Sequence, residues 1–155
     1  MGDEPIIRVE GATKAFGHGR GRVVAVDDVS LELAPNSISS VVGESGSGKT
    51  TLARMVLGLI KPTAGRVAFR GEDIAGFRSA ARRAYWRQVQ GVFQDPYSAF
   101  NQFFRVRKIL NDAFRLWPER PPRSERVDRS EQGLSLVNLK AEEVLGRYPF
   151  ELSGG

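Results

Sequence analysis

The sequence contains no cysteine and one histidine, His18. Without cysteine the chain can form neither a disulfide bond nor a thiolate metal site, which favours a protein of the reducing cytosol. No apolar run approaches the roughly 20 residues that a membrane-spanning helix needs. The first residues, MGDEPIIRVEG, have neither the basic start and apolar centre of a secretory signal nor the Ser or Thr of a myristoylation site.

The remaining composition is ordinary. With 155 residues, 41% of them hydrophobic and 26% charged, it is typical of one soluble globular domain. A net charge of +5 could indicate a surface that binds nucleic acid, anionic lipid or phosphate substrates. The favoured interpretation is that the cations lie on a solvated helix face. No RNA-binding aromatic motif or DNA-reading helix accompanies the cations, so no nucleic-acid partner is predicted. The cations concerned are Arg78, Arg82, Arg83, Arg87, Arg105, Arg107 and Lys108.

Strand signals dominate the first part of the chain. Runs of β-branched residues predict strands at Ile6–Val9 and Val23–Leu33. Ile38–Val42 is a short apolar run that enters a glycine-rich loop, which predicts a buried strand. Further strands are predicted at Val67–Phe69 and Val89–Phe93.

Helix signals follow the glycine-rich loop and return after Phe93. Apolar residues recur at helical spacing from Leu52, and Gly58 with Pro62 ends that helix. The later helices are predicted at Val106–Trp117, from a Ser124 cap toward Val137, and at Ala141–Leu145, with the proline-rich break PERPPRS before the second. The pattern predicts an α/β protein with a strand-rich core through about Gln94 and a mostly helical segment after it.

The stretch GESGSGKT matches the phosphate-loop pattern G-x-x-x-x-G-K-[ST] at every fixed position, between a predicted strand and a predicted helix. Glycines let backbone N–H groups approach phosphate oxygens, and the helix start adds the positive end of its dipole. Lys49 is predicted to reach the β- and γ-phosphates, and the Thr50 hydroxyl to bind Mg²⁺. The predicted loop comprises Gly43, Glu44, Ser45, Gly46, Ser47, Gly48, Lys49, Thr50 and Thr51.

Two later motifs narrow the class of phosphate-loop protein. VFQDPYSAFN places Gln94 after an apolar stretch, and YPFELSGG contains Ser153, Gly154 and Gly155. Phosphate loop, glutamine loop and LSGG in this order resemble the ATP-binding cassette (ABC) ATPases, and the resemblance covers essentially the whole chain. The stretches AVDDVSLEL, GESGSGKTTLAR, PTAGRV and FQDPYS are similar to the oligopeptide, dipeptide and nickel importer branch, although AFNQ stands where that branch usually has Ser-Leu-Asn-Pro.

The resemblance implies a role for each matching residue. Phe16 corresponds to the aromatic that stacks on adenine, and Gln94 to the residue that approaches Mg²⁺ and the attacking water. Residues 153–155 correspond to the signature, which binds the γ-phosphate of ATP held by a second ATPase subunit, identical or homologous. The implied fold is a P-loop NTPase core of the ABC type, a mixed sheet around the phosphate loop, with an α-helical subdomain. Its parts are a β-rich ATP-binding core at 1–94, the glutamine loop and helical subdomain at 95–151, and the start of the signature at 152–155.

The same resemblance implies an ATP-hydrolysing subunit that energises an importer, with oligopeptides or dipeptides as the expected cargo. Its expected cofactors are ATP and Mg²⁺. Its expected partners are transmembrane permease subunits and, indirectly, an extracytoplasmic solute-binding protein, which implies a peripheral position on the cytoplasmic face of the inner membrane. Two alternatives stay open. One is a non-transport ABC-type ATPase of DNA repair or translation, and the other is a nucleotide-binding fragment without turnover.

Two features imitate family motifs in the wrong order. VVAVDD looks like a magnesium-binding Walker B strand but precedes the phosphate loop, so Asp27 and Asp28 are interpreted as a turn or surface pair. His18 also lies upstream and does not match the switch histidine. A Walker B strand, a catalytic glutamate and a switch histidine after the signature are absent from the 155 residues. The chain is therefore expected to be the first part of a longer ATPase and to be inactive alone.

Overall fold

The computed structural model describes residues 4–95 and 100–152. The chain divides into two compact units, Met1–Arg82 and Arg83–Gly155, and each is described by itself. The boundary between 1–94 and 95–151 that the resemblance implies stays a prediction. The elements of the first unit are β1 (Ile7–Phe16), η1 (Gly19–Gly21), β2 (Val23–Leu33), α1 (Lys49–Val56), β3 (Ala64–Phe69), β4 (Glu72–Asp73) and η2 (Ile74–Gly76).

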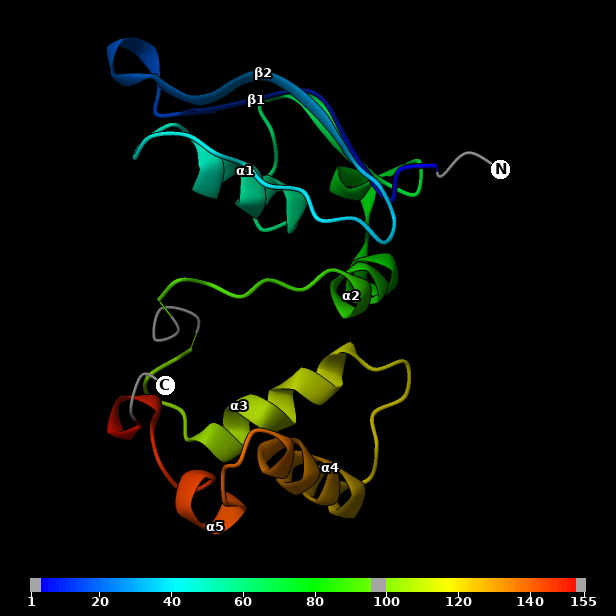
Figure 1. Ribbon diagram of the computed structural model, residues 1–155, viewed down its shortest axis with the longest axis vertical. Helices are drawn as coiled ribbons and strands as arrows, with labels where there is room; N and C mark the ends of the chain where they lie inside the picture. The colour runs from blue at the N-terminus through cyan, green and yellow to red at the C-terminus, as the bar shows by residue number, and fades with distance from the viewer. Residues whose placement is uncertain (1–3, 96–99, 153–155) are drawn as a thin grey trace. The chain divides into compact units, whose positions relative to one another are not determined.

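The first unit is built on a sheet of order β2-β1-β3-β4 in which neighbouring strands are antiparallel. β1 is central, and its alternation explains its place: Ile7 and Val9 are buried while Arg8 between them is exposed. The strand at Val23–Leu33 is confirmed, whereas β1 extends well beyond the predicted Ile6–Val9. Figure 1 shows β1 and β2 side by side, with α1 along one face of the sheet.

The helix predicted after the glycine-rich loop is confirmed as α1. Its buried residues, Leu52 and Met55, are three apart and therefore lie on one face, and Met55 is fully buried. The helix ends at Val56, and Gly58, two residues further on, has a left-handed φ of 67° and donates its N–H to the Met55 carbonyl. The Arg82 side chain donates to the carbonyls of Gly58 and Phe77, so it links two segments of the first unit. Arg82 is partly buried and not a fully solvated cation.

The predictions of a buried strand at Ile38–Val42 and of a further strand at Val89–Phe93 are wrong. Neither segment forms a strand, and Ile38 and Val42 are 99% and 92% exposed. A buried strand needs neighbours to accept its N–H and C=O groups, and within the described ranges no strand pairs with either segment. Apolar composition alone is not enough to form a strand.

The second unit is helical, as predicted. A small core joins its helices: Leu134, Val144 and Leu145 are buried, with Val106 and Leu110 packed against them. Its elements, which Figure 1 shows grouped together, are α3 (Val106–Ala113), η4 (Phe114–Leu116), α4 (Arg123–Leu136), α5 (Ala141–Val144) and η5 (Pro149–Glu151), while α2 (Ser79–Gln88) begins in the first unit and continues into the second.

The predicted Ser124 cap is wrong. The N-cap of α4 is Pro122, and Ser124 lies inside the first turn. Proline has a fixed φ and here adopts the extended backbone that precedes the helix, and its carbonyl accepts from the Arg126 N–H to close the first turn. No helix within the described ranges is long and apolar enough to cross a membrane.

Candidate functional site

The predicted phosphate loop turns tightly where glycine is required. Gly46 and Gly48 have φ values of 84° and 91°, in the region that favours glycine. A Cβ on Gly48 would lie 2.1 Å from the carbonyl oxygen of Ala25 in β2, whereas a Cβ on Gly46 would meet nothing within 4 Å. Gly48 therefore allows the loop to pass directly against the sheet, and Ala25 forms the wall behind it.

Lys49, the first residue of α1, turns back over the loop. Its ammonium group donates to the carbonyl oxygens of Gly43 at 2.8 Å and Glu44 at 2.5 Å, and lies 3.2 Å from the Ser47 hydroxyl oxygen. All three acceptors are neutral groups of the loop itself. The positive charge is thus held in place without a carboxylate partner, which leaves it available to an anion.

The start of α1 offers further donors to the same space. Gly48 is its N-cap, and no described side chain caps the helix. The first turn closes with the bond from the Leu52 N–H to the Gly48 carbonyl, so the N–H groups of Lys49, Thr50 and Thr51 have no acceptor within the helix. Together with the Lys49 ammonium they form an anion site of the phosphate-binding kind.

A cleft of about 490 Å³ lies between the loop and β2. Val26 and Leu52 form part of its apolar wall, and Gly43, Ser47 and Lys49 form its polar rim. The Thr50 side chain is exposed on the first turn of α1, where its hydroxyl oxygen could serve one cation. Among the described residues no group of three or more His, Cys, Asp or Glu side chains could hold a metal ion.

The other predicted site residues are not brought to this loop by the structure. Phe16 ends β1, 46% exposed, with the Lys14 ammonium 5.3 Å from its ring centroid. Gln94 is an exposed loop residue of the second unit, while Thr50 belongs to the first, and the two units are described separately. Ser153, Gly154 and Gly155 lie outside the described residues. The roles of Phe16, Gln94 and the signature stay predictions.

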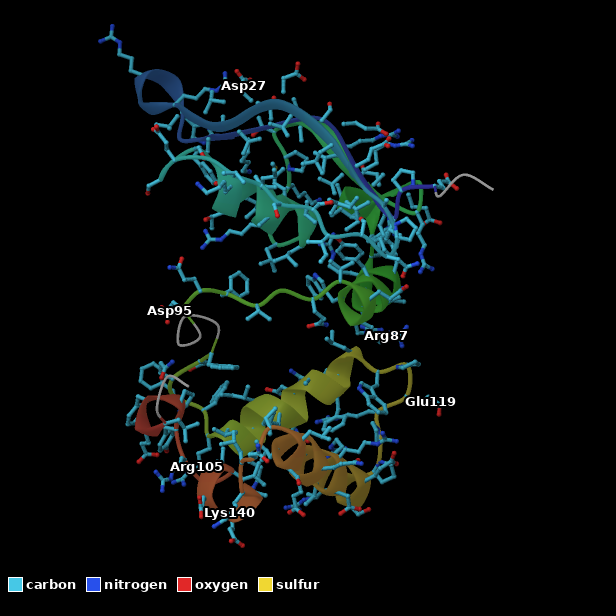
Figure 2. All side chains as sticks on the ribbon, viewed as in Figure 1. Asp27, Arg87, Asp95, Arg105, Glu119 and Lys140 are labelled. Carbon is cyan, nitrogen blue, oxygen red and sulfur yellow. The ribbon has the colours of Figure 1, made fainter. Side chains whose placement is uncertain are left out.

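Of the two features set aside in the sequence, the acidic pair lies on β2, and Asp27 also lines the cleft between that strand and the loop. Asp27, labelled in Figure 2, and Asp28 beside it are both exposed on β2, so they form a surface pair, in a strand and not in a turn. At Asp28, φ is 45° and the N–H donates to the Thr13 hydroxyl at 3.0 Å, because the register between β1 and β2 shifts at this point. His18 is exposed at the start of η1.

One part of the site has no signal in the sequence. Ala25 backs the phosphate loop through its backbone oxygen, so its side chain carries no information about the contact. A glycine at position 48 can mark either a left-handed backbone or a close approach, and the sequence does not distinguish the two.

The family model described as ABC transporter matches residues 26–155 of the chain. Because this is most of its length, the chain belongs to the ABC transporter family. The match includes the phosphate loop and the glutamine-loop stretch, and the predicted family is confirmed.

Named relatives agree with the predicted branch. A Brucella ovis protein whose name describes a peptide import ATP-binding protein is 34% identical over 155 residues, which is 100% of this chain and 48% of that protein. The oligopeptide transport ATP-binding protein OppF of Bacillus subtilis is 34% identical, with 98% and 50% covered. The nickel import ATP-binding protein NikE of Shigella boydii is 36% identical, with 97% and 57% covered. The chain spans about half the length of the curated relatives it matches.

Solved structures confirm the predicted fold class. The dimeric structure of a post-hydrolysis state of an ATP-binding cassette bound to ADP and Pi has a TM-score of 0.76 at 22% identity, and covers 96% of this chain and 63% of its own. A nucleotide-free ATP-binding cassette from an ABC transporter has a TM-score of 0.67 at 26% identity, with 97% and 60% covered. The fold is therefore that of an ABC ATPase cassette.

Proposed function

We propose that this chain binds ATP through Gly43–Thr51 and belongs to a subunit whose ATP hydrolysis energises an importer of oligopeptides or dipeptides. The observation that carries the proposal is the Lys49 ammonium, held over the loop by neutral acceptors beside the open start of α1. Membership of the ABC transporter family and the names of the peptide-import relatives support the activity and the cargo.

Binding of the triphosphate exchanges neutral partners for charged ones. The Lys49 ammonium leaves the carbonyls of Gly43 and Glu44 and pairs with phosphate oxygens, which are stronger acceptors because they carry formal charge. The free N–H groups of Thr50 and Thr51 donate to the same phosphates. The loop is therefore preorganised: its donors already face one space before the anion arrives.

The donors present also fit a magnesium ion. When bound, Mg²⁺ neutralises charge on the phosphate groups during transfer. The exposed Thr50 hydroxyl would be its ligand from the first turn of α1. The family resemblance implies that the Gln94 amide oxygen is a second ligand, which also orients the water. A hydroxyl and an amide are the hard oxygen ligands that Mg²⁺ prefers.

Further groups are proposed to contact the nucleotide or to carry the solute. Phe16, half-exposed at the end of β1, would stack on the adenine. Ser153, Gly154 and Gly155 would bind the γ-phosphate held by a second ATPase subunit. Permease subunits would carry the solute, and a solute-binding protein would deliver it, with this subunit peripheral on the cytoplasmic side.

The test is titration of the purified protein with a fluorescent ATP analogue, comparing Lys49→Ala with Arg54→Ala. Arg54 is an exposed cation of the same helix, in its last turn. Lys49→Ala should weaken binding by about 2–4 kcal/mol, roughly 30-fold or more, because it removes a charge-assisted contact to phosphate. Arg54→Ala should leave the affinity unchanged. Equal affinities for the two variants would show that the loop is not the nucleotide site.

A further inference from the structure

A groove of about 440 Å³ lies along the paired helices α3 and α4 in the second unit. The helices run antiparallel: Val106 at the start of α3 packs against the cluster that contains Leu134 near the end of α4, and Asn111 near the end of α3 bonds to Arg126 near the start of α4. The groove therefore follows the helix pair along its length. Its volume lies within the range of sites that hold a few ligand side chains.

The side chains around this groove are predominantly basic. Five cations line it and only one acid, Glu131. Such an excess of like charge along a narrow groove attracts anions and favours an anionic occupant. The cations are Arg105, Arg107, Lys108, Arg123 and Arg126.

Two of these arginines are held in place by neutral acceptors. Arg126 donates to the Asn111 side-chain oxygen at 2.7 Å and to the Pro121 carbonyl. Arg105, labelled in Figure 2, donates to the Gly146 carbonyl, and its guanidinium lies 4.9 Å from the Tyr148 ring centroid. These contacts orient each guanidinium and leave its charge uncompensated.

The remaining cations differ from one another. Lys108 pairs with Asp112, and this hydrogen bond holds the pKa of the Asp112 carboxyl below its ordinary value. Arg107 and Arg123 form no ion pair with any described carboxylate. Both are exposed, so their guanidinium groups can reach a bound molecule.

We propose that this groove binds an acidic segment of a partner polypeptide. Its carboxylates would pair with Arg107 and Arg123, and its apolar side chains would rest on Val127 and Leu145, which also line the groove. Arg107 lies at the start of α3, whereas Arg126 bonds to Asn111, four residues or about 6 Å further along that helix at 1.5 Å per residue, so the cations are spread along the groove. A line of cations above an apolar floor matches an extended or helical peptide.

Other anions fit this arrangement less well. A phosphate group is bound by convergent donors, usually glycine-rich backbone N–H groups, and here the cations are distributed along two helices. A lipid surface is broad and flat, whereas this site is concave. The proposal goes beyond nucleotide binding, since no residue of Gly43–Thr51 lines the groove.

The test measures anisotropy of a fluorescein-labelled peptide of glutamate and alanine with the purified protein. The double variant Arg107→Gln/Arg123→Gln is compared with Arg83→Gln/Arg87→Gln, which removes the same charge from exposed positions of α2. We expect the first variant to weaken binding at least tenfold, the second less than twofold, and added salt to weaken binding to the wild-type protein. The ATP-analogue affinity should be the same in both variants, so this test is independent of the nucleotide proposal.

Two outcomes would overturn the proposal. Equal weakening in the two double variants would mean that the peptide responds only to net charge. Pyrophosphate or phosphatidylglycerol vesicles that depend on Arg107 and Arg123 more steeply than the peptide does would assign the groove to phosphate or lipid. If the groove double variant fails to fold, the single variants Arg107→Gln and Arg123→Gln give the same comparison, each with Arg87→Gln as its control.

Discussion

At Gly48 the phosphate loop turns into α1 with a left-handed backbone, and the Ala25 carbonyl leaves no room for a Cβ. Gly46 shares the left-handed backbone but has open space beside it. Gly48 therefore meets two requirements, a positive φ and a close contact with another backbone, whereas Gly46 meets only the first. They give a matched pair of substitutions in one loop.

Gly46→Ala should cost about 1–3 kcal/mol of stability, the strain of a left-handed residue that is not glycine. Gly48→Ala should cost more, because its methyl group also displaces the loop from β2 and moves the start of α1. Urea unfolding of both variants measures the difference, and ATP-analogue affinity should fall further for Gly48→Ala. If the two variants unfold at the same urea concentration, the close contact with Ala25 is not a constraint in solution.

A second residue-scale prediction concerns the pair that joins β1 to β3. Arg66 donates to the Glu10 carboxylate at 2.5 Å, and this hydrogen bond lowers the pKa of Glu10 from its ordinary value. A carboxyl with a lowered folded-state pKa contributes stability above its unfolded pKa, about 4.3, and loses it as pH falls through the folded value. The contribution of this pair should thus be complete above about pH 5 and decline below about pH 4.

An NMR titration of the Glu10 carboxyl carbon tests this directly. In Arg66→Gln the pKa of Glu10 should rise toward its ordinary value, because the charged donor is gone. In Arg70→Gln it should stay low, since Arg70 lies over the Phe69 ring and not beside Glu10. A pKa of Glu10 that is unchanged in Arg66→Gln would show that the pair is not formed in solution.

At the scale of the element, α4 offers a test of what packing contributes. Leu134 is 7% exposed and packs with Val144 and Leu145, whereas Leu136, two residues on, is 81% exposed. Substitution of either leucine by alanine changes helix propensity equally, so any difference reports on packing. Leu134→Ala should cost about 2–5 kcal/mol and Leu136→Ala less than about 0.5 kcal/mol. Urea denaturation followed by far-UV circular dichroism measures both, and similar losses would contradict the placement of Leu134 in the core.

The elements that could be predicted from the sequence are those whose signals are local. The strand at Val23–Leu33 and the helix from Lys49 follow from residue types and periodicity within a few positions. Ile38–Val42 could not be predicted correctly, because strand formation depends on a partner strand elsewhere. The N-cap of α4 at Pro122 could not be predicted, because proline and serine are both common at the start of a helix and Ser124 lies only two residues away.

The candidate site also has a part that could be predicted from the sequence and a part that could not. The phosphate loop carries a motif in which each residue type has a local physical reason, so its glycines and Lys49 could be identified directly. The Ala25 contact could not, because it is made by backbone from a distant strand. Gln94 is placed by family resemblance, and its position relative to Thr50 depends on the arrangement of the two units.

At the scale of the whole molecule, the described donors of the proposed nucleotide site come from a single region, the phosphate loop and the start of α1. The Lys49 ammonium lies back over the loop, and the Thr50 side chain is exposed on the first turn of the same helix. A phosphate chain held this way presents its γ-end to whatever lies opposite. In the proposed function, the γ-phosphate is bound by Ser153, Gly154 and Gly155 of a second subunit, the role that the family resemblance implies for them.

We therefore expect the intact subunit, together with its partner ATPase where that is a different chain, to dimerise when a non-hydrolysable ATP analogue and Mg²⁺ are added. Light scattering coupled to size exclusion measures the mass. Lys49→Ala should abolish the dimer by removing the nucleotide, whereas Ser153→Arg should abolish it while ATP-analogue binding to the monomer persists, because the signature acts only across the interface. Dimerisation that survives Ser153→Arg would mean that a different surface joins the subunits, and that the LSGG stretch does not bind the neighbouring nucleotide.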